Sequence, residues 1–250
     1  METASALPAP AAQPAVRQNP LDRLIVALDF PCTDAAMGLV DQLQGVSRWF
    51  KVGMELYYAA GNQVVERLLD RGFQVFLDLK LHDIPNTVAG GVRSAACAGA
   101  SLLTIHASGG EPMMRAAAQA AARPNCPELL AVTVLTSMDQ AGLNATGVSG
   151  TPADQALRLA RLARAAGIHG LVCSAEEVAA LREVMGASAR LVVPGIRPAS
   201  TASDDQSRIA TPADAIARGA SMLVVGRPIT QAENPARAAA AILAEIDSAL

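Results

Sequence analysis

The sequence predicts a single (β/α)8 barrel, also called a TIM barrel. Eight short apolar runs recur along the chain, and a longer stretch with helical periodicity follows each of them. Eight such pairs in roughly 230 residues match the element count of this barrel. A doubly wound sheet is the alternative. It usually has fewer strands, however, and no GxGxxG motif follows the first apolar run.

The eight apolar runs are predicted to be parallel strands. They are nearly continuous in hydrophobic residues and are bounded by glycine or polar residues, as expected of strands that are buried on both faces. The predicted strands cover residues 24–30, 48–53, 74–81, 101–107, 128–136, 170–175, 190–198 and 222–229.

The stretches between the strands are predicted to be helices. Several begin with a proline in the first turn and end at a glycine, for example the stretch from Pro152 to Gly167. The predicted helices cover residues 34–43, 55–70, 87–98, 112–122, 152–166, 175–185, 212–218 and 235–249.

Composition limits the class of protein. Of 250 residues, 51% are hydrophobic and 17% are charged, which is enough apolar material for a large core. The net charge of −3 and the aromatic content of 3% argue against nucleic acid or a membrane surface as the main partner. Four cysteines without CxxC spacing fit a reducing cytoplasm, which is the expected location.

The domain organisation is predicted to be simple. Residues 1–20 are rich in alanine and proline and have no helical period, so they are expected to form a disordered extension. No shift in composition marks a second domain, and the barrel is expected to cover residues 21–250.

Polar residues near the ends of the predicted strands are the candidate site. In this fold, functional groups project from the carboxyl ends of the strands. Nearly every predicted strand finishes in a group that ionises or forms hydrogen bonds. These residues are Asp29, Lys51, Asp78, Lys80, Asp83, His106, Thr136, Ser174, Arg197 and Arg227.

The third strand carries the densest group of charges. Side chains alternate along a strand, so Asp78 and Lys80 should face the barrel interior while the leucines between them face the helices. Lys51 supplies a second cation and Asp83 a second anion. Buried charges need partners, and these four residues could form an alternating array. A purely structural ion-pair network is the alternative.

The last two strands predict a phosphate site. Glycine followed by arginine stands after both strands, with Arg197 near Gly195 and Arg227 beside Gly226. The loops after strands 7 and 8 are the usual phosphate site of this barrel, and arginine matches phosphate geometry. The polar loop 199–208 could close as a lid that carries Gln206 to the ligand. Two ordinary surface turns are the alternative.

No metal or organic cofactor is predicted. The three histidines lie in different elements without metal-ligand spacing, and His106 could equally be a satisfied core residue. No motif for nicotinamide, flavin or a P-loop is present.

The run 76–87, FLDLKLHDIPNT, closely resembles the signature of the orotidine 5′-phosphate decarboxylase family. Further segments resemble that family in order along the chain: LDF at 28–30, FKVG at 50–53, TIHA at 104–107, TVLTS at 133–137, PGIR at 194–197, DQSR at 205–208 and GRPI at 226–229.

The resemblance implies a cofactor-free and metal-free homodimer. Such an enzyme converts orotidine 5′-phosphate to UMP and CO2, the last step of de novo pyrimidine synthesis. It further implies that Lys80 donates a proton to C6, that Asp78 lies beside the substrate carboxylate, and that Lys51 completes the array. Asp83 would reach the site of the partner subunit. Substrate contacts are expected from Asp29, Lys51, Asp78, Thr87, Thr136, Ser174, Arg197, Gln206, Gly226 and Arg227.

Two alternatives remain. A Mg²⁺-dependent phosphosugar decarboxylase shares the DxKxxD core, but that family has an acidic residue where this chain has Lys51. A barrel that binds a nucleotide without turnover is the other alternative. A sensor of that kind has no need of a buried lysine pair.

Overall fold

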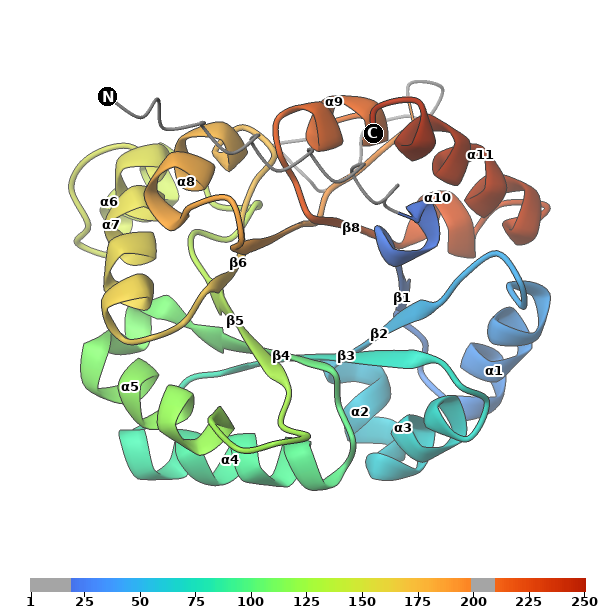
Figure 1. Cartoon of the computed structure of the whole chain (residues 1–250), viewed down its shortest axis with the longest axis horizontal. Coiled ribbons are helices and arrows are strands. Elements are labelled where there is room, and N and C mark those ends of the chain that lie inside the picture. The colour runs from blue at the N-terminus through green and yellow to red at the C-terminus, as the bar shows by residue number, and fades with distance from the viewer. Residues whose placement is uncertain (1–18, 199–209) are drawn as a thin grey trace, which may run out of the picture.

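The computed structural model, which describes residues 19–198 and 210–250, is a closed barrel of eight parallel strands (Figure 1). Each strand pairs with the next along the chain, and the last pairs with the first. The predicted (β/α)8 barrel is therefore confirmed. The strands are β1 (Leu24–Leu28), β2 (Trp49–Gly53), β3 (Gln74–Leu81), β4 (Leu102–His106), β5 (Glu128–Val132), β6 (Gly170–Val172), β7 (Arg190–Val193) and β8 (Met222–Val225).

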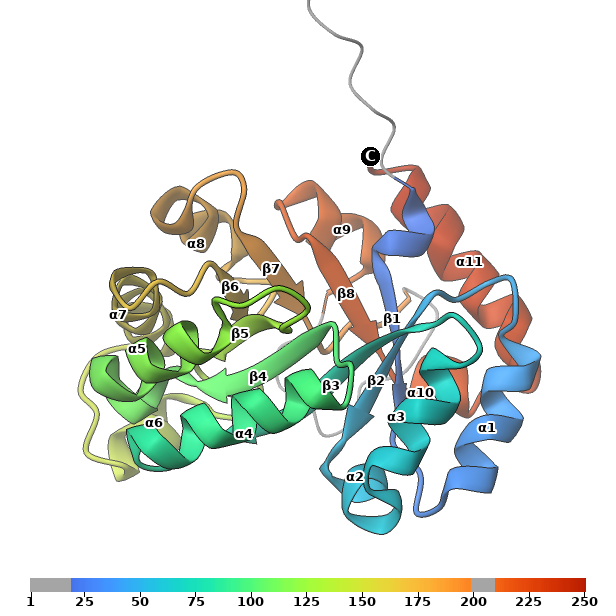
Figure 2. The ribbon, with the colours of Figure 1, turned by 60° about the horizontal axis from the view of Figure 1, so that its bottom comes forward.

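Helices surround the barrel, as Figure 1 shows along its axis and Figure 2 shows from the side. The α-helices are α1 (Thr33–Gln42), α2 (Met54–Ala60), α3 (Asn62–Leu69), α4 (Pro85–Cys97), α5 (Gly110–Ala121), α6 (Gln140–Ala145), α7 (Pro152–Ala165), α8 (Val178–Met185), α9 (Pro212–Ala217), α10 (Arg227–Thr230) and α11 (Pro235–Asp247). Two short 3-10 helices are η1 (Pro20–Asp22) and η2 (Ala107–Gly109).

Several element boundaries differ from those predicted. The expected helix 55–70 is divided into α2 and α3 at Gly61, whose φ of +59° does not fit a continuous helix. The expected fifth strand ends at Val132, because the apolar residues that follow it, such as Val134, line a cavity instead of continuing the sheet. Two short helices, α6 and α10, were not predicted.

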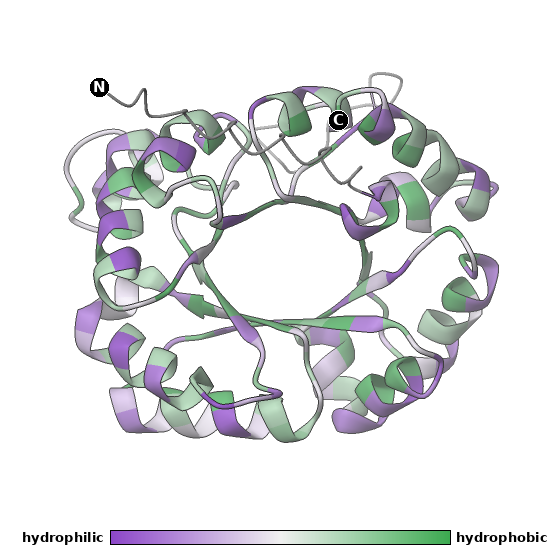
Figure 3. Cartoon of the chain, in the orientation of Figure 1, coloured by the Kyte–Doolittle hydropathy of each residue, from purple (hydrophilic) through white to green (hydrophobic). Residues whose placement is uncertain are grey.

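The alternation of side chains builds two separate cores. Residues such as Phe76, Leu102 and Leu130 fill the interior of the barrel, whereas Leu77 and Leu103 belong to the core between strands and helices. The helices carry both hydrophobic and hydrophilic residues, as expected when one face packs on the barrel and the other meets water (Figure 3). The inward-facing rows position the site, because they continue into the mouth of the barrel.

Two predicted segments lie wholly or mainly outside the described residues. Of the extension 1–20, only Asn19 and Pro20 are described, and Pro20 begins η1. The predicted lid 199–208, including Gln206, also falls outside them. Within the described part of the chain, no helix is long and apolar enough to cross a membrane.

Candidate active site

A cavity of about 480 Å³ opens at the carboxyl ends of the strands. Its lining mixes apolar side chains from the barrel with charged groups from both sides of the mouth. The sequence-predicted residues that line it are Asp29, Lys51, Asp78, Lys80, Thr136, Arg197, Gly226 and Arg227. The volume suits a small-molecule ligand of nucleotide size.

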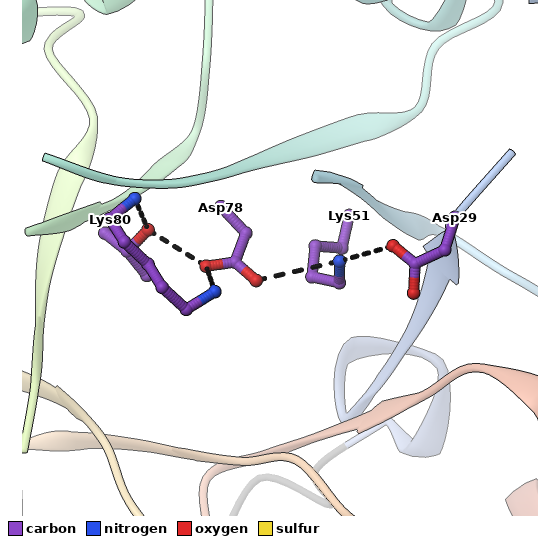
Figure 4. Close-up of polar contacts among 5 residues, drawn as sticks. Asp29, Lys51, Asp78 and Lys80 are labelled. Carbon is purple, nitrogen blue, oxygen red and sulfur yellow. Dashed lines mark hydrogen bonds and ion pairs between the residues drawn. The ribbon is translucent and has the colours of Figure 1, made fainter. Parts of the chain in front are cut away.

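Two lysines and two aspartates form a continuous chain of ion pairs across one wall of the cavity (Figure 4). Lys51 Nζ lies 2.9 Å from Asp29 Oδ1 and 3.6 Å from Asp78 Oδ2. Lys80 Nζ lies 2.8 Å from the other oxygen of the same carboxylate, Asp78 Oδ1. Opposite charges therefore alternate in the order Asp29, Lys51, Asp78 and Lys80, and strands β1, β2 and β3 supply them.

The central carboxylate stays ionised. Burial alone would raise the pKa of Asp78, but the positive charges of Lys51 and Lys80 lower it. Hydrogen bonds from Lys80 and Thr104 act in the same direction, so the pKa of Asp78 lies below its usual value. At neutral pH the array therefore presents a fixed anion between two ammonium groups.

Gly53 allows the lysine of β2 to take its place in the array. A Cβ at this position would lie 2.9 Å from Lys51 Nζ and 3.1 Å from Asp29 Oδ1. Real Cβ atoms do not approach a neighbour as closely as the first of these distances, so a side chain here would require the Lys51 ammonium to shift against its two ion pairs.

The backbone of β3 is irregular at the lysine. Leu77 pairs with Leu103, but the next pair joins Leu81 to Ile105, so the register shifts between them. Within this bulge Lys80 has a φ of +49°, in the left-handed region that residues with a Cβ rarely adopt. Strain of this kind persists only where the surroundings hold it, and it clusters at functional sites.

One residue that holds this geometry was missed by the sequence analysis. Thr104 in β4 accepts a hydrogen bond from the Lys80 main-chain N–H at 2.9 Å and donates to Asp78 Oδ1 at 3.0 Å. It is fully buried. The available signal was a polar residue between Leu103 and Ile105, at an inward-facing position of the mainly apolar run SLLTIHA.

The arginines lie next to the array, because β8 pairs directly with β1 and Gly226 lies beside Asp29. Arg197 follows β7 and is buried, with its Nη1 donating to the Ile196 carbonyl at 3.0 Å. Arg227 follows β8 at the start of α10, directly after Gly226. Both residues line the same cavity as the lysine–aspartate array.

Three predicted site residues do not line this cavity. Asp83 is exposed, and its carboxylate accepts a hydrogen bond from the adjacent Ile84 N–H at 2.6 Å. Thr87 is exposed in the first turn of α4. Ser174 is buried, and its N–H donates to the Glu177 carboxylate at 3.1 Å, because the chain turns into α8 there.

His106 ends β4 outside the cavity lining. It is half-buried, and its ring centroid lies 5.3 Å from that of His82. Burial is the largest of the effects that lower its pKa, followed by His82 and Lys80, while Asp78 raises it. His106 is therefore neutral at physiological pH and adds no charge to the array. In the described part of the chain, no three His, Cys, Asp or Glu side chains cluster as metal ligands would.

Fold and site together define an enzyme of the (β/α)8-barrel class whose charged residues line one cavity at the barrel mouth. A sequence model of one family matches residues 22–242, nearly the whole described chain. The chain belongs to the orotidine 5′-phosphate decarboxylase / HUMPS family.

Similar proteins agree with this membership. Orotidine 5′-phosphate decarboxylase of Halorhodospira halophila is 56% identical over 228 residues, covering 91% of this chain and 97% of that protein. The protein of the same name from Nitrosococcus oceani is 52% identical over 227 residues, 90% and 98% of the two chains. The crystal structure of orotidine 5′-phosphate decarboxylase from Lactobacillus acidophilus matches with a TM-score of 0.79 at 40% identity, covering 90% and 99%.

Proposed function

We propose that this enzyme decarboxylates orotidine 5′-phosphate to UMP and CO2, the last step of de novo pyrimidine synthesis. The relatives with more than half of their residues identical are named for this substrate and reaction. The observation that carries the proposal is the alternating array of Asp29, Lys51, Asp78 and Lys80 in the cavity. Its charges suit a reaction that moves negative charge onto a carbon atom.

Lys80 is the proposed proton donor. When the bond between C6 and the carboxylate breaks, its electron pair stays on C6 in an orbital that the pyrimidine ring cannot delocalise. An ammonium group fixed beside C6 stabilises this charge, because it needs no reorganisation during the reaction. Lys80 then transfers a proton to C6, which completes UMP, and CO2 leaves. The 2.8 Å pair with Asp78 supports a fixed position for the ammonium.

Asp78 and Lys51 have supporting roles in this proposal. Asp78 would lie beside the substrate carboxylate. The repulsion between these two carboxylates is relieved as CO2 departs. Lys51 compensates the charge of Asp78 and, through its 2.9 Å pair, positions Asp29 to contact the ribose. Asp29 is the most accessible member of the array, with 59% of its side chain exposed, which suits a contact with a hydroxyl-rich sugar.

The substrate phosphate is proposed to bind beside the arginines that follow β7 and β8. Arg197 and Arg227 line the cavity there, and Gly226 leaves room for close approach. Thr136 also lines the cavity and is proposed to contact the ligand. Contacts of Ser174 with the pyrimidine and of Gln206 with the phosphate stay predictions.

A homodimer is proposed to complete the site. Asp83, three residues after Lys80, is exposed, and the adjacent Ile84 is 67% exposed, which is high for an isoleucine. A second copy of the chain could cover this segment, so that Asp83 and Thr87 approach the partner's cavity. The cytoplasmic location stays a prediction as well.

The test is the absorbance of orotidine 5′-phosphate mixed with the purified protein and excess EDTA. Loss of the orotate band with formation of UMP supports both the reaction and the proposed independence from metals and cofactors. Turnover that appears only after Mg²⁺ is restored would support the reaction but contradict its independence from metals, and no change under either condition would favour a phosphosugar substrate. UMP binding without turnover under both conditions would favour the non-catalytic alternative.

A further inference from the structure

Thr104 is a buried threonine that touches two members of the array without reaching the cavity. Its neighbours Leu103 and Ile105 pack in the core between strands and helices, whereas Leu102 packs inside the barrel. Thr104 therefore points inward like Leu102, two residues further along β4 toward its carboxyl end. It is 0% exposed and is absent from the cavity lining, so any effect on the ligand must pass through other residues.

The hydrogen bonds of this hydroxyl have only one consistent direction. The Lys80 main-chain N–H can only donate, so Thr104 Oγ1 accepts at 2.9 Å. Ionised Asp78 can only accept, so the hydroxyl proton points to Oδ1 at 3.0 Å. The same Oδ1 accepts the ammonium of Lys80 at 2.8 Å. These three contacts close a ring that joins the backbone of Lys80, Thr104, Asp78 and the Lys80 ammonium.

The backbone of Lys80 needs such a contact. The register shift between β3 and β4 takes this residue out of the regular ladder, and its φ of +49° is costly for a residue with a Cβ. A buried N–H without an acceptor is also costly. The hydroxyl of Thr104 satisfies this N–H and at the same time fixes the carboxylate that binds the end of the lysine side chain.

We propose that Thr104 is a positioning residue of the decarboxylation reaction. It fixes both the backbone and the ammonium of Lys80 in the position from which the ammonium reaches the reacting carbon. This inference rests on the proposed function. A substitution of Thr104 should therefore change turnover and not substrate affinity, because the groups proposed to bind phosphate and ribose lie elsewhere in the cavity.

The experiment compares T104V, which keeps the shape but loses the hydroxyl, with T104S, which keeps the hydroxyl. For T104V we expect kcat to fall ten- to a hundredfold, with KM within about twofold of wild type, since each lost bond involves a charged or strained partner. T104S should retain at least a third of the wild-type kcat. The acidic limb of kcat/KM in T104V should shift to higher pH, because Asp78 loses a bond to its ionised form.

Thr133 provides a matched control. It is also a buried threonine, and its hydroxyl donates to the Val172 carbonyl at 3.1 Å, away from the array. T133V should lose stability in thermal unfolding but keep its kcat. Equal losses of kcat in T104V and T133V, or a T104V kcat within threefold of wild type, would overturn the inference.

If T104V does not fold, T104S carries the test, and a loss of more than tenfold in T104S would overturn the inference. If wild-type protein does not turn over orotidine 5′-phosphate, the proposed function fails by itself. The carboxyl pKa of Asp78 in wild type and T104V, measured by NMR, then decides whether Thr104 holds the array. An unchanged pKa would overturn that role.

Discussion

Replacement of Asp78 by asparagine removes the anion between two ammonium groups and leaves the shape of the side chain almost unchanged. At an effective dielectric near 20, its 2.8 Å pair with Lys80 corresponds to about 6 kcal/mol and its 3.6 Å pair with Lys51 to about 5 kcal/mol. These are gross Coulomb energies. Desolvation and the 27% exposure of the Lys80 side chain reduce the net loss, so we expect the free energy of unfolding to fall by about 3 kcal/mol.

The same substitution should lower kcat by about 100- to 1000-fold, as the loss of one preorganised electrostatic contact does in other active sites. The assay follows the orotate absorbance band at saturating substrate, alongside unfolding in urea. D34N is the matched control, because Asp34 is 96% exposed and pairs with Arg67 on the surface at 3.6 Å. A D78N enzyme with a kcat within tenfold of wild type would refute the electrostatic reasoning.

The stability difference between wild type and D78N should depend on pH. The pKa of Asp78 is lower in the folded protein than in the unfolded chain, where it is about 3.9. Its contribution to stability is therefore fully present above that value and is lost as the pH falls through the folded-state pKa. Urea unfolding at about pH 6 and at more acidic values measures the difference, and a difference that grows in acid would contradict this assignment.

Three further substitutions separate the roles of the lysine–aspartate array and of the arginines. Lys80→Ala should abolish turnover but leave the circular dichroism spectrum intact, and rapid turnover would exclude it as proton donor. Arg227→Ala should raise KM about 10- to 100-fold with a smaller effect on kcat, because it removes a charge-assisted phosphate contact; an unchanged KM would argue against that contact. Gly53→Ala should lower kcat at least tenfold because its Cβ displaces Lys51, whereas Gly38→Ala, with open space around it, should not, and equal activities would contradict the steric argument.

The barrel and much of its charged site could be predicted from the sequence. Strands in a parallel barrel alternate strictly between two faces, so the positions of Asp78 and Lys80 relative to the leucines sufficed to predict that both point inward. The structure confirms that both line the cavity. The arginines after β7 and β8 could be placed because the ends of neighbouring parallel strands meet at one edge of the barrel.

Other features depend on contacts that a linear pattern does not contain. The bulge at Lys80 arises from the way β3 pairs with β4, so neither its φ of +49° nor the role of Thr104 follows from either strand alone. The alternation of side chains also does not predict how far along the barrel axis a residue lies. Ser174 lies in the turn before α8, where its N–H donates to Glu177, and it does not line the cavity.

The position of the charged groups around the barrel has a consequence for its local stability. The lysine–aspartate array belongs to β2, β3 and the residue after β1, and the arginines follow β7 and β8, of which β8 pairs with β1. A ligand that contacts both sets therefore spans the seam where the first and last strands of the chain pair, so opening either side of this seam also breaks ligand contacts. Slow amide hydrogen exchange should therefore extend on UMP binding across β7, β8 and β1 to β3 together, with β4, which has no residue in the cavity lining, gaining less protection.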